Sequence, residues 1–193
     1  MTREELTEFE EEIKNLFLDK KILSPIHLSR GNEDQLINIF KNIVRSDWVF
    51  STHRSHYHAL LKGVPKEWLR QEILENRSIH IFNNEYNFFS SAIVGGCLPI
   101  AVGVAMGMKI QKSTSKVWIF VGDMASETGA FHECVKYAGR NNLPITFIIE
   151  DNGLSTDTPT QKVWGLEHSR NPVTRYYYER ELPHVGAGEW VSF

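Results

Sequence analysis

Two short apolar runs, each closed by polar residues, place the strongest constraint on the fold of this chain. Residues 117–121 lead into Gly122-Asp123, and residues 144–149 lead toward Asn152. Residues 128–140 between the runs have helical character. Strand, helix and strand in this order predict a parallel βαβ unit. Asp123 and Asn152 then follow the carboxyl ends of their strands, the edge at which open α/β sheets bind ligands.

Asp123 and Asn152 offer a carboxylate and an amide oxygen, hard ligands suited to a magnesium ion that holds a diphosphate. The main-chain carbonyl of Leu154 is a further candidate ligand by position alone. A helix entered around residues 125–128 would present backbone N–H groups to phosphate oxygens. The alternative is an ordinary crossover in which the Asp caps a helix.

The spacing also resembles the motif of thiamine diphosphate enzymes, in which Gly-Asp-Gly precedes Asn-Asn by a little under thirty residues. Here the motif stands as Gly122-Asp123-Met124 and Asp151-Asn152, so the metal-binding Asp and the final Asn are kept. Met124 replaces a glycine, and we expect its side chain to narrow the diphosphate path or to require a shifted backbone.

Three earlier segments extend the resemblance to one family, the alpha subunits of the decarboxylating component of 2-oxo acid and acetoin dehydrogenase complexes. They are HRSHYHALLKG at 53–63, SIHIF at 78–82 and the Gly-rich stretch at 92–105. The four motifs occur in the family's order between about residues 26 and 159. The resemblance implies an α/β fold, a parallel-sheet three-layer thiamine-diphosphate-binding fold that is truncated at the C-terminus.

The resemblance also implies a site. Arg54 would bond diphosphate oxygens in a fork, and His53 would donate a hydrogen bond. His56 and His80 are the expected catalytic residues, although a structural hydrogen bond suits His80 equally well. Cofactor-binding positions carried over are His53, Arg54, Gly95, Gly96, Leu98, Gly122, Asp123, Met124, Ala125 and Asn152, and the metal ligands are Asp123, Asn152 and Leu154. Zinc at His53, His56 and His58 is disfavoured, because no second ligand cluster accompanies them.

Composition narrows the class of protein. The 193 residues are 41% hydrophobic, enough for a substantial α/β core, and the formal net charge of −3 gives no broad attraction to nucleic acid. Cys97 and Cys134 are typical of reduced core thiols in a cytoplasmic protein. The uncharged stretch at 92–108 is short and contains Pro99, which favours a buried helix over a membrane span.

Periodicity divides the chain into a cofactor-binding domain at 1–162 and a C-terminal extension at 163–193. Aromatic and Arg residues cluster in the extension, which favours a subunit contact. Thr2 and Glu5 form a capping box at the start of the first helix. Expected helices cover residues 2–19, 33–45, 65–75, 90–109 and 128–140, and expected strands cover 47–51, 116–121 and 144–150.

The resulting hypothesis is an alpha-type subunit that binds thiamine diphosphate and magnesium. A beta-type partner would contribute the activating glutamate in an α2β2 heterotetramer, and the reaction would be 2-oxo acid decarboxylation or dehydrogenation with acyl transfer. The alternatives are a split transketolase-like or acyloin-forming subunit, and a degenerate scaffold without catalysis.

Overall fold

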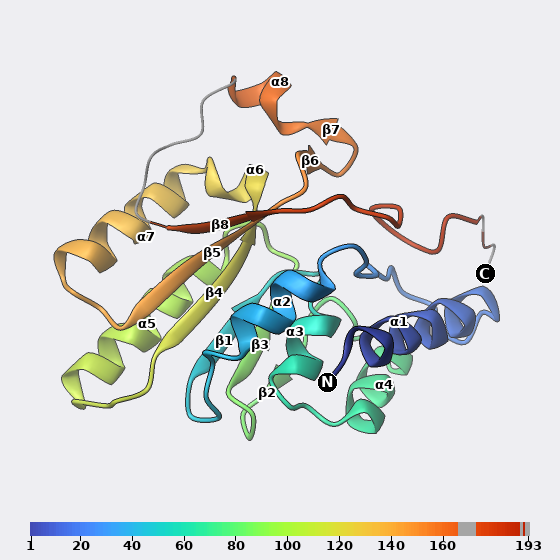
Figure 1. The fold of residues 1–193 in the computed structure, drawn as a ribbon, viewed down its shortest axis with the longest axis horizontal. Coiled ribbons are helices and arrows are strands. Elements are labelled where there is room, and N and C mark those ends of the chain that lie inside the picture. Colours follow the sequence, from blue (N-terminus) through green and yellow to red (C-terminus); the bar gives the residue numbers. More distant parts are fainter. Residues whose placement is uncertain (166–172, 190, 192–193) are drawn as a thin grey trace.

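A six-stranded sheet forms the centre of the molecule, and the computed structural model describes residues 1–165, 173–189 and 191. The strand order is β2-β3-β1-β4-β5-β8, and every neighbouring pair is parallel except the antiparallel β2–β3 pair (Figure 1). The strands are β1 (Trp48–Ser51), β2 (Phe82–Asn83), β3 (Phe88–Ser90), β4 (Val117–Gly122), β5 (Ile145–Asp151) and β8 (Thr174–Tyr177). A separate two-stranded ribbon joins β6 (Leu154–Ser155) to β7 (Thr158–Pro159).

Helices cover both faces of the sheet, which gives three layers (Figure 1). One face carries α1 (Arg3–Leu18), α2 (Glu33–Phe40), α3 (His56–Leu61) and α4 (Lys66–Leu74). The other face carries α5 (Cys97–Ile110) and α7 (Gly129–Arg140). The short helices α6 (Asp123–Ser126) and α8 (Thr160–Trp164) lie beyond the carboxyl ends of β4 and β5.

Alternate residues of the central strands enter two separate hydrophobic cores, because successive side chains of a strand point to opposite faces. Phe120 and Ile148 pack with α1 to α4, whereas Ile119 and Phe147 pack with α5 and α7. Burial on both faces explains why β4 and β5 are nearly continuous apolar runs in the sequence.

The predicted βαβ unit is confirmed. β4 and β5 pair in parallel with Val117 opposite Ile145, and α7 connects them. The side chain of Thr128 accepts a hydrogen bond from the Phe131 N–H at the start of α7. The capping box of Thr2 and Glu5 is also present at α1.

Two predicted helices were too long. The Gly-rich helix begins at Cys97 rather than Ser90, because Gly95 adopts a left-handed φ of +74°, which a helix does not accommodate. The second helix ends at Phe40 rather than Arg45. The segment expected as an extension supplies β8, which pairs with β5 in the main sheet. Within the described residues, no helix has the length and apolar character needed to cross a membrane.

Ile119 provides a test of the core on the α5 and α7 face. Its side chain is fully buried, so Ile119→Ala should lower the free energy of unfolding by about 2–5 kcal/mol in urea denaturation. Ile110→Ala is the matched control, because Ile110 is 74% exposed and its truncation should change stability by less than about 0.5 kcal/mol. Equal effects of the two substitutions would contradict this packing.

Candidate functional site

A cavity of about 320 Å³ opens at the carboxyl edge of the sheet, where the direction of the connections reverses. From β1 the chain passes through α3 and α4 to β3 on one side, and from β4 it passes through α7 to β5 on the other. Such a switch point leaves a crevice between neighbouring strands, which is where open α/β sheets bind ligands.

The structure brings most of the predicted site residues to this one cavity. Segments that follow β1, β4 and β5 line it, together with the loop before α5 and the chain after β8. The predicted residues that line it are His53, Arg54, Gly95, Leu98, Gly122, Asp123, Met124, Ala125, Asn152 and Leu154. Gly96, His56 and His80 are not among the described residues that line the cavity.

Asp123 is the first residue of α6 and is only 2% exposed. Its carboxylate accepts a hydrogen bond from the Thr160 hydroxyl. Burial raises the pKa of Asp123, and the nearby Asp151 charge raises it further, whereas the bond from Thr160 acts in the opposite direction. A carboxylate whose charge is disfavoured by burial and by a second acid is stabilised by a bound cation.

Asn152 directly follows β5 and also lines the cavity. Its Oδ1 accepts the Leu154 N–H at 3.0 Å, and its Nδ2 donates to the Tyr178 hydroxyl at 3.1 Å. These bonds fix the orientation of the amide while Oδ1 keeps a second lone pair. With the Asp123 carboxylate and the Leu154 carbonyl, this oxygen donor set fits magnesium.

Met124 and Asp151 mark the departures from the family motif. Met124 lies in α6 without a positive φ, so no left-handed backbone is needed there, and its Sδ accepts a hydrogen bond from Trp164 Nε1 at 2.8 Å. Asp151 Oδ2 lies 2.6 Å from Arg175 Nη1 on β8, and Asp151 Oδ1 accepts the Gly153 N–H. Asp151 therefore anchors β8 and the turn after β5.

Arg54 is buried at the cavity wall and ties remote segments together. Its Nη1 donates to the Leu28 carbonyl, and its Nη2 donates to the His184 carbonyl at 3.1 Å. Burial lowers the pKa of Arg54. A guanidinium carries five N–H donors, so the two carbonyl bonds leave donors for an anionic oxygen.

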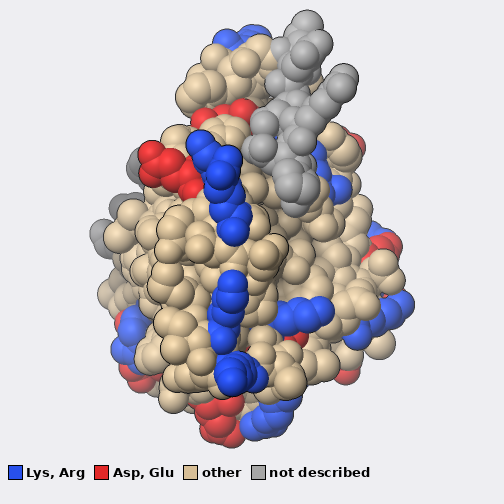
Figure 2. All heavy atoms as spheres, turned by 90° about the vertical axis from the view of Figure 1, so that its left-hand side faces the viewer, with Lys and Arg blue, Asp and Glu red and all other residues tan. Residues whose placement is uncertain are grey.

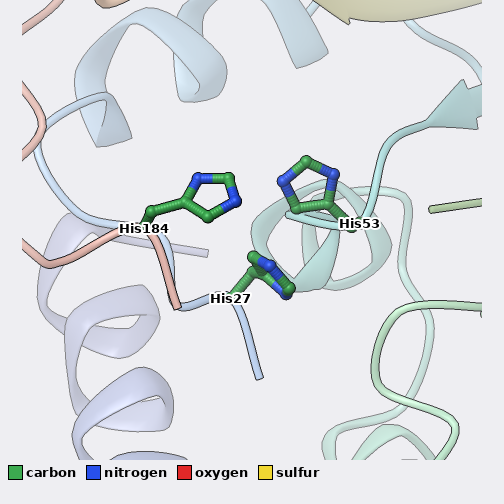
Figure 3. Close-up of side chains that lie close together, drawn as sticks. All are labelled: His27, His53 and His184. Atoms are coloured by element: carbon green, nitrogen blue, oxygen red, sulfur yellow. The ribbon is translucent and has the colours of Figure 1, made fainter. Parts of the chain in front are cut away.

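Three histidines meet at the same cavity. The ring centroids of His27 and His53 are 4.3 Å apart, and those of His27 and His184 are 5.0 Å apart (Figure 3). Burial, reinforced by neighbouring cationic groups, lowers the pKa of His27 to about 3 and that of His53 to about 4. Burial likewise lowers the pKa of His184, so the three imidazoles are neutral at neutral pH.

His56 and His80 lie in different surroundings. His56 is fully buried between Glu10 and Ser78, with its Nδ1 3.0 Å from Glu10 Oε2 and its Nε2 2.9 Å from Ser78 Oγ. His80 is exposed just before β2. Their catalytic roles stay predictions, and direct contact of His56 with a ligand would require movement of its neighbours. His58, considered as a zinc ligand, instead lies 3.2 Å from Glu150 Oε1.

Several site residues escaped the sequence analysis. Tyr178, His27 and His184 line the cavity with Asp123, and Thr160 bonds the Asp123 carboxylate, but none of the four belongs to a motif that was recognised. The aromatic and Arg cluster of the C-terminal segment was the one available indication, and it was interpreted as a subunit contact.

Comparison with known proteins decides the family. The profile of the dehydrogenase E1 component family matches residues 1–169. The chain belongs to this family. Family membership confirms the resemblance that the sequence motifs indicated.

Relatives of this chain include alpha subunits of two kinds of enzyme. Pyruvate dehydrogenase E1 component subunit alpha-3 of Arabidopsis thaliana chloroplasts is 31% identical over 160 residues, which are 75% of this chain and 37% of the relative. The alpha subunit of acetoin:2,6-dichlorophenolindophenol oxidoreductase from Bacillus subtilis is 30% identical over 165 residues, 80% of this chain and 50% of the relative. The chain thus spans half or less of the length of these relatives. A solved chain assigned as a thiamin diphosphate-dependent enzyme from Mycobacterium smegmatis has a TM-score of 0.43 and 17% identity, over 62% of this chain and 20% of that one.

The histidine cluster predicts acid lability of the chain in the absence of ligands. Between pH 6.5 and about 4, the unfolded chain takes up protons at positions 27 and 53 that the folded chain does not, so the free energy of unfolding should fall as pH is lowered through this range. His27→Gln should make that fall shallower in urea titrations at several pH values. His132→Gln is the control, because His132 lies on α7, a helix that does not line the cavity. An identical pH dependence of the free energy of unfolding in both variants would contradict the lowered pKa of His27.

Proposed function

We propose that this E1 component chain binds the diphosphate and magnesium of thiamine diphosphate for a heteromeric 2-oxo acid or acetoin dehydrogenase. The observation that carries the proposal is that Arg54, Asp123 and Asn152 line one cavity at the switch point of the parallel sheet. They come from three different strand ends, and together they offer a guanidinium and hard oxygens to one ligand.

Each group has a distinct task in this proposal. Asp123, Asn152 and the Leu154 carbonyl would hold magnesium, whose charge would offset that of the diphosphate. Arg54 and His53 would bond the diphosphate oxygens, and Gly95, with its φ of +74°, turns the loop before α5 at the cavity wall. Thiamine diphosphate, when bound, supplies the nucleophilic carbon and the electron sink for 2-oxo acid decarboxylation, dehydrogenation and acyl transfer.

The proposal includes a beta-type partner that supplies the activating glutamate in an α2β2 assembly. One face of α5 supports a partner, because Ile100, Met106 and Ile110 are exposed on it. A Cβ added at Gly103 or Gly107 would meet nothing within 4 Å, so a second helix has room to approach closely. Figure 2 shows that the side on which α5 and α7 lie is mostly uncharged, with Lys and Arg side chains in a row across it. We place this assembly in the cytoplasm, in keeping with the two free cysteines.

Asp123→Asn tests the metal site with little change of shape. The complex should be purified through a tag on this chain and titrated calorimetrically with thiamine diphosphate over a range of magnesium concentrations. Loss of a charged ligand should weaken magnesium-dependent cofactor binding by at least about tenfold, since bonds to charged groups contribute about 1.5–3 kcal/mol. Asp34→Asn is the control, because Asp34 is an exposed acid on α2. Unchanged affinity and magnesium dependence in Asp123→Asn would refute the metal assignment.

Arg54→Ala tests the diphosphate anchor separately from the metal. Cofactor affinity should fall tenfold to hundredfold, because hydrogen bonds to charged groups contribute about 1.5–3 kcal/mol. The remaining binding should still depend on magnesium. Arg45→Ala, at a 70% exposed arginine, is the matched control. Circular dichroism of both variants separates a binding defect from unfolding, because Arg54 also bonds two main-chain carbonyls. Full affinity in folded Arg54→Ala would remove Arg54 from the site.

A further inference from the structure

Three histidines from separate parts of the chain converge at one side of the cavity, and the motif-based site accounts for only one of them. His27 precedes α2, His53 follows β1, and His184 follows β8 (Figure 3). We propose that His27, His53 and His184 form a binding site for a divalent transition-metal ion, with Zn²⁺ as its occupant. This site is separate from the oxygen ligands assigned to magnesium.

The geometry suits a small ion. One ring nitrogen from each histidine can be chosen so that all three lie within 4.8 Å of one another. A zinc ion with Zn–N bonds of about 2.0–2.1 Å in a tetrahedron needs ligand nitrogens about 3.4 Å apart. Small rotations of the three histidine side chains would bring their nitrogens from within 4.8 Å to this separation. Figure 3 shows the three rings gathered around a common space, as ligands of one ion require.

A β-bridge and hydrogen bonds hold the three segments together without an ion. Residue 27 forms a parallel bridge with Gly186, and the Gly186 N–H donates to the Ile26 carbonyl at 2.9 Å. Arg54, the neighbour of His53, donates to the carbonyls of Leu28 and His184. Each of the three segments is therefore hydrogen-bonded to at least one of the other two, through the histidine itself or through its neighbour in the chain. A preorganised set of ligands lowers the cost of ordering when a metal binds.

The imidazoles are in the protonation state that a metal requires. Nδ1 of His27 is buried and has no hydrogen-bond partner within the described structure, which leaves a polar atom that an ion would satisfy. The lowered pKa values of all three rings keep them neutral near pH 7, so metal binding need not displace protons.

The surrounding charges decide which ion fits. Besides burial, the Arg54 charge lowers the pKa of all three histidines and Arg180 lowers that of His184, but Arg180 Nη2 is paired with Asp157 Oδ1 at 2.8 Å. Glu150 acts on His53 and Asp157 acts on His184 in the direction that favours a cation. Three nitrogen donors select zinc over magnesium, which prefers oxygen. All three residues line the cavity, so water or a ligand oxygen can complete the tetrahedron from that side.

The test uses the full chain, stripped with a chelator and dialysed, then titrated with ZnCl₂ and separately with CoCl₂ in excess magnesium. One zinc ion should bind per chain, and cobalt should give the intense visible absorption of a tetrahedral complex. His27→Ala and His184→Ala should each weaken zinc binding by at least about tenfold, the lower end of what the loss of even an outer-shell group costs. His132→Ala on α7 and Asp123→Asn should retain the affinity, the latter because it alters only the oxygen site.

A second variant keeps the test valid if the alanine variants unfold. His184→Cys replaces one ligand by another, and thiolate coordination should add a near-ultraviolet charge-transfer band to the cobalt spectrum. The proposal is overturned if no zinc binds, or if His27→Ala and His184→Ala bind it as His132→Ala does. It is also overturned if Asp123→Asn abolishes binding, or if folded His184→Cys adds no such band. His53 belongs to both proposed sites, but the zinc titrations contain no thiamine diphosphate, so their failure can be told apart from failure of the proposed function.

Discussion

The parallel pairing of β1, β4 and β5 is the constraint on which the site depends. Hydrogen bonding holds neighbouring strands about 4.8 Å apart, and parallel direction brings their carboxyl ends to one edge. The register sets Gly122 opposite Glu150, so Asp123 and Asp151 follow at the same level of the carboxyl edge. Burial of Ile119, Phe120, Phe147 and Ile148 in the two cores fixes this register, since a slip by one residue would exchange the two faces. Core packing thereby sets the position of the polar residues at the edge.

Arg54 holds together the segments that form one wall of the cavity. A buried guanidinium is costly unless it is well bonded, and the two carbonyls of Leu28 and His184 supply charge-assisted partners. These bonds bring the segment before α2 and the segment after β8 against the end of β1. The same residue that is proposed to hold the diphosphate therefore also positions His27 and His184. The hydrogen bonds of Arg54 thus place a positive charge and the three neutral imidazoles at the same side of the cavity.

Local patterns in the sequence sufficed for the elements whose determinants are local. The apolar runs of β4 and β5 and the capping box at Thr2 each depend on residues within one turn or strand, and each was predicted. The start of α5 was predicted too early because the small, apolar residues before Cys97 fit a helical pattern. The left-handed φ of Gly95 prevents the helix from extending to them. β8 was missed for a different reason, because its four residues are held by pairing with β5 and by the Arg175–Asp151 bond. The His27 and His184 contact is similarly non-local, and no spacing rule in the sequence encodes it.

Burial also divides the titratable groups into those that can act on a ligand and those that cannot reach one. His56 is enclosed between Glu10 and Ser78, so in this structure it orients the start of α3, and through α3 the loop that carries His53 and Arg54. Glu150, in contrast, lines the cavity; burial acts to raise its pKa, but the neighbouring His58, Tyr176 and Arg54 outweigh burial, so the pKa of Glu150 is lowered. Among the described residues, the acids and histidines that line the cavity are Asp123, Glu150, His27, His53 and His184. A metal held by the three histidines would occupy one ring-nitrogen lone pair of each, so these imidazoles would not act as bases while the metal is bound.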